Sequence, residues 1–283
     1  MTRNELKNMF QALAIQNATT VTGKLTEVHR PAVKKLVDAG ALFVVNHSGG
    51  KDSQATYAVI KHLVPHDQIA VVHCDLGEVE WDGAFDHVKA TTDHPIHVTK
   101  AIWADGSDKT LLDAIERRGL WPAGPQRYCT SDLKRGPAEK VIRRLSKETG
   151  RTVIVSCFGF RREESDARAK KTVWADVPRN SKAGRTWIDF SPILEITTSQ
   201  VFQIIEEAGQ EPHWAYADGN ERLSCVFCIF GSANDLRHGA EARPELFRRY
   251  VELEARLGHT FLNGQTLEEK AGITLNQLTG ETK

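Results

Sequence analysis

Residues 41–63 restrict the fold more than any other part of the chain, because an apolar run, a two-glycine turn and a helical pattern follow one another without a break. Residues 41–45 are continuously apolar, which is typical of a strand covered on both faces. The turn His-Ser-Gly-Gly-Lys-Asp-Ser follows at residues 47–53, and residues 53–63 form a predicted helix that ends before Pro65. Adjacent glycines let backbone N–H groups point at one place, and the positive end of the helix adds to them. The segment therefore predicts an anion cradle, with phosphate as its natural occupant.

The cradle is not a Walker-type P-loop, because GxxxxGK[ST] is absent and the lysine lies inside a shorter loop. A tight strand-to-helix turn without a ligand is the alternative interpretation, since short glycine-rich strings also occur without function.

Strands and helices alternate along the first two thirds of the chain, which predicts a parallel sheet with helices on both faces, an α/β fold. Further strands are expected at residues 68–74, 96–98 and 152–158, and an edge strand at 188–194 that tolerates Pro192. Helices are expected at residues 27–38, 81–91, 109–118, 137–149 and 198–208, with a loop at 124–136. A helical region through Leu257 and a polar tail complete the chain. We expect three parts: an N-terminal helical segment at 1–40, a nucleotide-binding α/β domain at 41–195, and a C-terminal helical region at 196–283.

The net charge gives no sign of a nucleic-acid or anionic-membrane partner. The 283 residues contain 37 Lys+Arg and 37 Asp+Glu, so no global positive field attracts nucleic acid or membrane. Local basic pairs occur at 117–118, 143–144, 170–171 and 248–249, and leave a nucleic-acid contact open. Residues 1–16 lack the apolar core of a signal peptide, and no later run approaches membrane-spanning length. We expect a cytoplasmic protein without membrane contact.

Five cysteines, at positions 74, 129, 157, 225 and 228, argue against a secreted disulfide framework because their number is odd. Cys225 and Cys228 are spaced to place two thiolates on one metal or cluster. Zinc completed by His213 or His238, and two buried thiols without metal, are the alternatives. Cys74 and Cys157 lie in predicted strands and are expected in the core, with Cys157 as a reserve ligand.

Several strings in order resemble one family. Ser48 to Ser53, SGGKDS, resembles the PP-loop of the N-type ATP pyrophosphatases. The strings Asp75-Leu76-Gly77, Arg127-Tyr128-Cys129-Thr130 with Leu133-Lys134, Gly159 to Arg168 (GxRxxESxxR), and Tyr216 to Gly219 before the cysteine pair are similar to segments of the phosphoadenylylsulfate (PAPS) reductase branch. The resemblance extends to phage and prophage PAPS reductase-like proteins and to the C protein of DNA phosphorothioation systems. It implies an adenine nucleotide alpha hydrolase-like, Rossmann-like fold.

The resemblance implies the roles of individual residues. Phosphate-binding residues would be Ser48, Gly49, Gly50, Lys51, Asp52, Ser53, Asp75, Lys134, Gly159, Arg161 and Arg168, with Lys51, Asp52 and Arg161 also catalytic. Lys51 would neutralise charge on departing pyrophosphate, and guanidinium forks would clamp phosphate or sulfate. Asp52 would either bind Mg²⁺ or orient the loop, its simplest alternative being a helix N-terminal carboxylate. Asp75 would contact ribose or metal at the carboxyl edge of the sheet.

In the resembling family a cysteine in the Cys129 loop joins the later pair around a [4Fe–4S] cluster. Cys129, Cys225 and Cys228 would then be the ligands of a cluster, or of zinc. Adenylylsulfate reductases carry two adjacent cysteines in that loop, whereas Thr130 follows Cys129 here.

The resemblance implies ATP-dependent activation more than simple reduction, because no cysteine follows Cys228 and the usual C-terminal catalytic thiol is missing. We expect ATP, with Mg²⁺, to be cleaved between its α and β phosphates to adenylylate an acceptor in sulfur transfer. Partners would be an adenine nucleotide and a sulfur donor or reductant protein, and a homodimer is left open. A PAPS or adenylylsulfate reductase without the C-terminal cysteine, and a nucleotide-binding regulatory or assembly subunit, are the alternatives.

Overall fold

The computed structural model describes residues 20–124 and 126–280. The expectations for residues 1–16, and the first 19 residues of the expected N-terminal segment, fall on residues outside this part of the chain.

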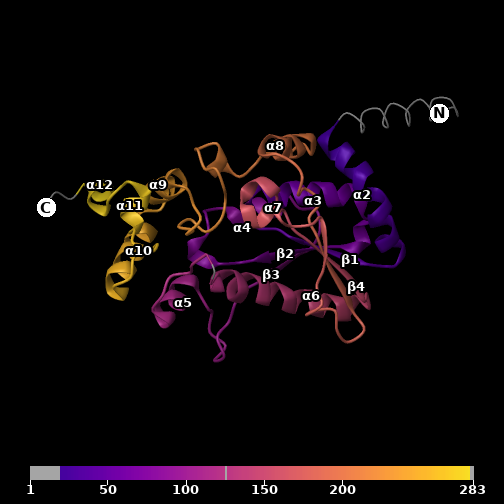
Figure 1. Cartoon of the computed structure of the whole chain (residues 1–283), viewed down its shortest axis with the longest axis horizontal. Helices are drawn as coiled ribbons and strands as arrows, with labels where there is room; N and C mark the ends of the chain where they lie inside the picture. The colour runs from indigo at the N-terminus through magenta and orange to yellow at the C-terminus, as the bar shows by residue number, and fades with distance from the viewer. Residues whose placement is uncertain (1–19, 125, 281–283) are drawn as a thin grey trace.

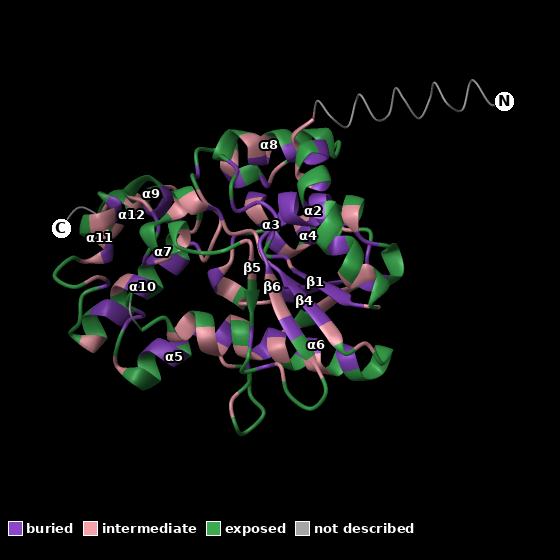
Figure 2. Ribbon diagram, turned by 45° about the vertical axis from the view of Figure 1, so that its right-hand side comes forward, coloured by how far each residue is buried: buried purple, intermediate pink, exposed green. Residues whose placement is uncertain are grey.

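A six-stranded, mostly parallel sheet forms the centre of the protein, in the order β3-β2-β1-β4-β6-β5 (Figure 1). The strands are β1 (Leu42–Asn46), β2 (Ile69–Cys74), β3 (Ile96–Thr99), β4 (Val153–Cys157), β5 (Trp174–Asp176) and β6 (Thr186–Phe190). Only β5 runs antiparallel, beside β6. The predicted parallel α/β fold is confirmed, and β1 and β4, the two central strands, are buried as their apolar runs require (Figure 2).

Helices cover both faces of the sheet (Figure 1). On one face lie α2 (Val21–Asp38) and α3 (Lys51–Leu63), with α8 (Thr198–Glu207) packed against α3. The other face is covered by α6 (Gly136–Thr149), whose Val141, Ile142 and Leu145 pack on Val44 and Ile154. The shorter α4 (Ala84–Ala90) and α7 (Asp166–Ala169) follow β2 and β4 in sequence.

A second apolar cluster joins α5 (Leu111–Arg118) to the C-terminal helices. These helices are α9 (Ala233–Ala242), α10 (Pro244–Leu257), α11 (Leu267–Ala271) and α12 (Leu275–Thr279). Phe227, Phe247, Tyr250 and Trp121 are buried in it. The segment that carries Cys225 and Cys228 therefore packs as part of this cluster.

Two expectations about the elements are wrong, and the polar tail contains two helices. The strand expected at 188–194 is β6, which ends at Phe190 and lies inside the sheet, since the antiparallel β5 forms the edge. Residues 193 and 194 follow the strand and are also buried. Their apolar side chains made the strand look longer in the sequence than it is. The expected loop at 124–136 contains a π-helical turn, Cys129–Arg135, that runs directly into α6. The tail after Leu257 holds α11 and α12, because Thr266 and Thr274 begin capping boxes within a polar stretch.

None of the helices in the described ranges is both long enough and apolar enough to cross a membrane.

Candidate active site

The glycine-rich loop lies where the strand order reverses. From β1 the chain moves outward through β2 and β3, and then returns to place β4 on the other side of β1. Ligands of open α/β sheets bind at such a switch point, beyond the carboxyl ends of the strands. The loop follows β1 there, and Gly159 follows β4. The fold thus brings two of the sequence-predicted segments together.

Internal hydrogen bonds hold the loop in shape. Gly49 has φ +81°, a conformation that favours glycine, and its N–H donates to His47 Nδ1 at 3.1 Å. Ser53 Oγ donates to the Gly50 carbonyl at 2.8 Å and accepts from the Ser48 N–H at 3.2 Å. Burial, with smaller contributions from His73 and His87, lowers the pKa of His47 to about 3, so His47 is neutral and its Nδ1 remains an acceptor.

Gly159 lets the segment that follows β4 approach the glycine-rich loop closely. A Cβ at Gly159 would lie 2.4 Å from the Asp52 carbonyl oxygen and 2.9 Å from the Ser53 nitrogen, which are distances that no side chain tolerates. The backbone of Gly159 is therefore in direct contact with the start of α3. We expected this glycine to admit a nucleotide, and the structure places it against the loop itself.

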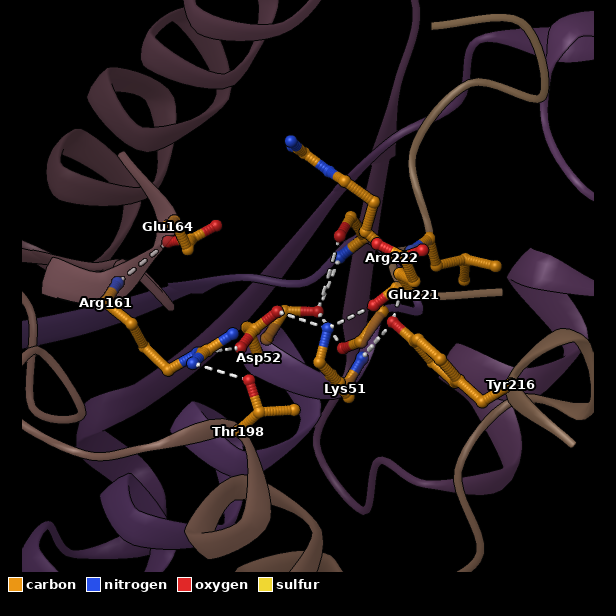
Figure 3. Close-up of polar contacts among 12 residues, drawn as sticks. Lys51, Asp52, Arg161, Glu164, Thr198, Tyr216, Glu221 and Arg222 are labelled. Atoms are coloured by element: carbon orange, nitrogen blue, oxygen red, sulfur yellow. Dashed lines mark hydrogen bonds and ion pairs between the residues drawn. The ribbon is translucent and has the colours of Figure 1, made fainter. Parts of the chain in front are cut away.

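Lys51 and Asp52 begin α3 and are held from several directions (Figure 3). The Lys51 side chain is only 3% exposed, and its Nζ donates to the Glu221 carbonyl at 3.0 Å and lies 3.4 Å from Asp52 Oδ2. The Lys51 backbone N–H donates to the hydroxyl of Tyr216 at 3.0 Å, and Nζ lies 5.0 Å from the centre of that ring.

Arg161 joins the loop to α8. Its Nε lies 2.5 Å from Asp52 Oδ1, and its Nη1 donates to Glu163 and, at 3.0 Å, to Thr198 Oγ1. Burial lowers the pKa of Arg161, but the carboxylates of Asp52 and Glu163 more than offset this and leave the pKa raised. Asp52 thus lies between two cations, Lys51 and Arg161. The three expected catalytic residues form one ion cluster.

Arg168 lies beside this cluster, and Asp75 lies at the end of the neighbouring strand β2. Arg168 stacks on the Phe160 ring at 3.7 Å and donates to Glu164 at 3.3 Å. Glu164 in turn accepts the Arg161 backbone N–H at 2.8 Å. Asp75, at the end of β2, accepts from the Gly77 N–H at 2.7 Å and pairs with Lys100 at 3.3 Å. A cleft beyond β2 and β3 is lined by Asp75, Gly77 and Lys100, together with Lys109 and Leu133.

Lys134 lies with the cysteines. Cys225 is the main cause that raises the pKa of Lys134, with Cys228 and Cys129 adding to it and burial opposing it. Burial raises the pKa of the Cys225 thiol to about 12, against the effect of Lys134. Among the described residues Lys134 forms no hydrogen bond or ion pair with Lys51 or Asp52, and the groups that raise its pKa are the three thiols and Glu80.

The thiols gather without forming a metal site. Among residues 20–124 and 126–280, no three His, Cys, Asp or Glu side chains converge closely enough to hold a metal ion. The structure therefore does not bring Cys129, Cys225 and Cys228 together as one set of metal ligands. Cys157 is fully buried between the sheet and α2, as expected of a core residue, and lies in a different cluster from the Cys225 pair. Cys74 is half-buried, and its Sγ donates to the Lys134 carbonyl at 3.3 Å.

Sequence reasoning gave no role to Tyr216, Glu221 or Thr198, although all three contact the ion cluster. Tyr216 belongs to the string 216–219 that resembles the family, and this resemblance is the signal in the sequence that could have pointed to it.

A glycine-rich loop between strand and helix, at the switch point of a parallel sheet and lined by Lys51 and Arg161, defines a nucleotide-binding α/β protein. Residues 43–230 match the phosphoadenosine phosphosulfate reductase domain family, and the chain belongs to that family.

Relatives of this chain have uncharacterized functions. A protein of Methanocaldococcus jannaschii is 26% identical over 215 residues, which are 75% of this chain and 47% of that protein. A 37.8 kDa protein of Escherichia phage 186 is 28% identical over 144 residues, 51% of this chain and 42% of that protein. The chain thus spans less than half the length of either relative.

Two solved structures are similar to this chain at low identity. PAPS reductase from Candida auris has a TM-score of 0.47 at 16% identity, covering 80% of this chain and 96% of that one. NMN synthetase from Francisella tularensis has a TM-score of 0.43 at 11% identity, covering 93% and 87% respectively.

Replacing Gly159 with alanine tests the packing of the loop. We expect Gly159→Ala to lower the free energy of unfolding by about 1–3 kcal/mol, because its Cβ would overlap the Asp52 carbonyl. Urea denaturation measures this. Gly124→Ala is the matched control, since nothing lies within 4 Å of its Cβ. Equal stability of the two variants would contradict the close approach.

Acidification tests the buried His47. Its pKa is lowered to about 3 in the folded protein and is about 6.5 unfolded, so the unfolded chain takes up the proton first and stability is lost as pH falls below about 6.5. Between pH 7 and pH 5 we expect His47 to account for about 2 kcal/mol of that loss. His47→Asn, which keeps an acceptor for Gly49, should show a correspondingly shallower decline in urea denaturation. His213, whose pKa is lowered to about 4, contributes equally to both proteins. Parallel declines would show that His47 is not the group responsible.

Proposed function

We propose that this protein binds ATP in the glycine-rich loop and cleaves it between the α and β phosphates, so that an acceptor is adenylylated for sulfur transfer. The observation that carries the proposal is the convergence of Lys51, Asp52 and Arg161 on the loop at the switch point of the sheet. This is the place where a polyanion meets both the helix N-terminus and fixed cations. Membership of a family whose name refers to a sulfonucleotide supports the nucleotide class.

The proposed step is an in-line displacement at the α phosphorus. An acceptor oxygen or sulfur forms a bond to that phosphorus while the bond to the bridging oxygen breaks, and pyrophosphate leaves with the electron pair. Negative charge therefore grows on the β phosphate. Lys51 and the amides at the start of α3 are the groups placed to neutralise that charge, and Arg161 with Arg168 are the next cations along the same edge.

Asp52 serves, in this proposal, to orient the cations. Its two carboxylate oxygens already lie 2.5 Å from Arg161 Nε and 3.4 Å from Lys51 Nζ. A carboxylate that balances two cations has little charge left for a metal ion. We therefore assign Asp52 to the ion cluster, and expect Mg²⁺ to enter with the phosphate oxygens of ATP.

Exchange of labelled pyrophosphate into ATP, with candidate acceptors present, tests the reaction. We expect Lys51→Ala to lower the exchange rate by about 100-fold or more, the cost of removing one charge-stabilising group. Lys34→Ala is the control, because Lys34 is exposed and pairs only with Asp38 on α2. ATP binding without exchange would favour the regulatory or assembly subunit, and sulfite release from a sulfonucleotide would favour the reductase.

A [4Fe–4S] cluster or zinc on Cys129, Cys225 and Cys228 stays a proposal from the family resemblance. Burial is the main cause that raises the pKa of Cys225 and Cys129, and the Lys134 cation beside them opposes it, so Lys134 is the group here that supports thiolate. No step of the proposed reaction runs through this group.

Anaerobic purification followed by iron, sulfide and zinc assays tests the cysteine proposal. We expect iron and sulfide in the wild type and their loss in Cys225→Ser, because a thiolate ligand is removed. Cys157→Ser is the matched control, since Cys157 lies in the core and should leave the metal content unchanged. Metal-free protein whose three thiols react with a thiol reagent would contradict the proposal.

A further inference from the structure

Residues 214–224, which we call the cover segment, lie over the glycine-rich loop (Figure 3). They join α8 to the Cys225 pair, far from the loop in sequence. Trp214 Nε1 donates to the Asp82 carbonyl at 2.9 Å, and the Glu221 N–H donates to Asp235 at 2.8 Å. The cover segment is thereby attached at both ends.

The Tyr216 hydroxyl is the point of contact with the loop. It accepts the backbone N–H of Lys51 at 3.0 Å and the backbone N–H of Leu223 at 3.2 Å. Two amides from separate segments thus converge on one oxygen atom. Burial is the main cause that raises the pKa of Tyr216, so the oxygen belongs to a neutral phenol.

The cover segment also holds the Lys51 ammonium and lies close to Gly50. Lys51 Nζ is held by the Glu221 carbonyl, and the side chain is 3% exposed. A Cβ at Gly50 would lie 3.3 Å from the Leu223 carbonyl oxygen and 3.4 Å from the Tyr216 hydroxyl. The Lys51 amide is thus engaged by Tyr216, and its buried ammonium is engaged by the Glu221 carbonyl.

We propose that Tyr216 is a plug in the phosphate cradle, and that a polyphosphate binds by displacing its hydroxyl and the Glu221 carbonyl from Lys51. This inference rests on the proposed function, because it takes the loop to be a phosphate site. The exchange is favourable because two neutral acceptors give way to charged oxygens, and hydrogen bonds to charged acceptors are stronger. The leaving hydroxyl frees the Leu223 amide as a further donor to the same anion. Tyr216 is accordingly a positioning residue that reduces affinity for any ligand unable to displace it.

Calorimetric titration with inorganic pyrophosphate tests the plug. Tyr216→Phe keeps the ring and its edge contact with Phe202 but removes the oxygen. We expect pyrophosphate to bind about three- to tenfold more tightly to Tyr216→Phe than to the wild type, because one hydrogen bond no longer competes. Tyr57→Phe is the matched control: its hydroxyl also accepts a backbone N–H, from Asp93 at 2.8 Å, but lies away from the loop. We expect unchanged pyrophosphate affinity in Tyr57→Phe.

The outcomes separate this inference from the proposed function. Absence of pyrophosphate and ATP binding in the wild type overturns the proposed function. Wild-type binding that is weakened or unchanged in Tyr216→Phe overturns the plug and leaves the phosphate site standing.

Hydrogen–deuterium exchange on the wild type gives a second test that does not depend on a variant folding. We expect pyrophosphate to speed exchange in residues 214–224 while slowing it in residues 48–54. Slower exchange in both segments would mean that the cover segment closes on the ligand, which contradicts displacement.

Discussion

The ion cluster of Lys51, Asp52 and Arg161 is the interaction on which the site depends. Lys51 and Arg161 are almost fully buried, and buried cations are costly unless a carboxylate and further acceptors compensate them. Asp52 supplies the carboxylate, while Glu221, Thr198 and Glu163 supply the other acceptors. The cluster therefore fixes the start of α3 relative to β4 and α8, and holds positive charge at the switch point without exposing it to water.

The backbone makes this cluster achievable. Asp52 can reach Arg161 only because Gly159 has no side chain and the two backbones touch. Gly49 turns the chain with positive φ, and neutral His47 accepts its amide. Burial lowers the pKa of His47 and keeps its ring neutral. The packing around His47 therefore preserves the Nδ1 acceptor that holds the Gly49 amide.

Local patterns predicted the sheet and the loop well, because a strand, a turn and a helix that are adjacent in sequence leave few arrangements. The apolar runs of β1 and β4 and the glycine pair of the loop are of this kind. The contacts of Tyr216 and Glu221 with Lys51 join residues 165 and 170 positions apart, and no local pattern encodes them. Lys134 was expected beside phosphate, but the π-helical turn that begins at Cys129 places it among the thiols. An extra residue in a helical turn redirects the side chains after it, and no local sequence pattern indicates that turn.

The cover segment connects the glycine-rich loop with the cysteine pair, Cys225 and Cys228. Tyr216 touches the loop, Leu223 donates to Tyr216, and Cys225 follows two residues later with Lys134 beside it. Val226 is fastened to Val79 by a backbone hydrogen bond of 2.9 Å, so the cysteine end is held by the segment after β2. Between Tyr216 and that fixed point the chain is also held by the hydrogen bond from the Glu221 N–H to Asp235 at 2.8 Å. Tyr216 and Cys225 belong to the same stretch of chain, so the glycine-rich loop and the thiols are joined by one short length of backbone whose two ends are fixed by packing.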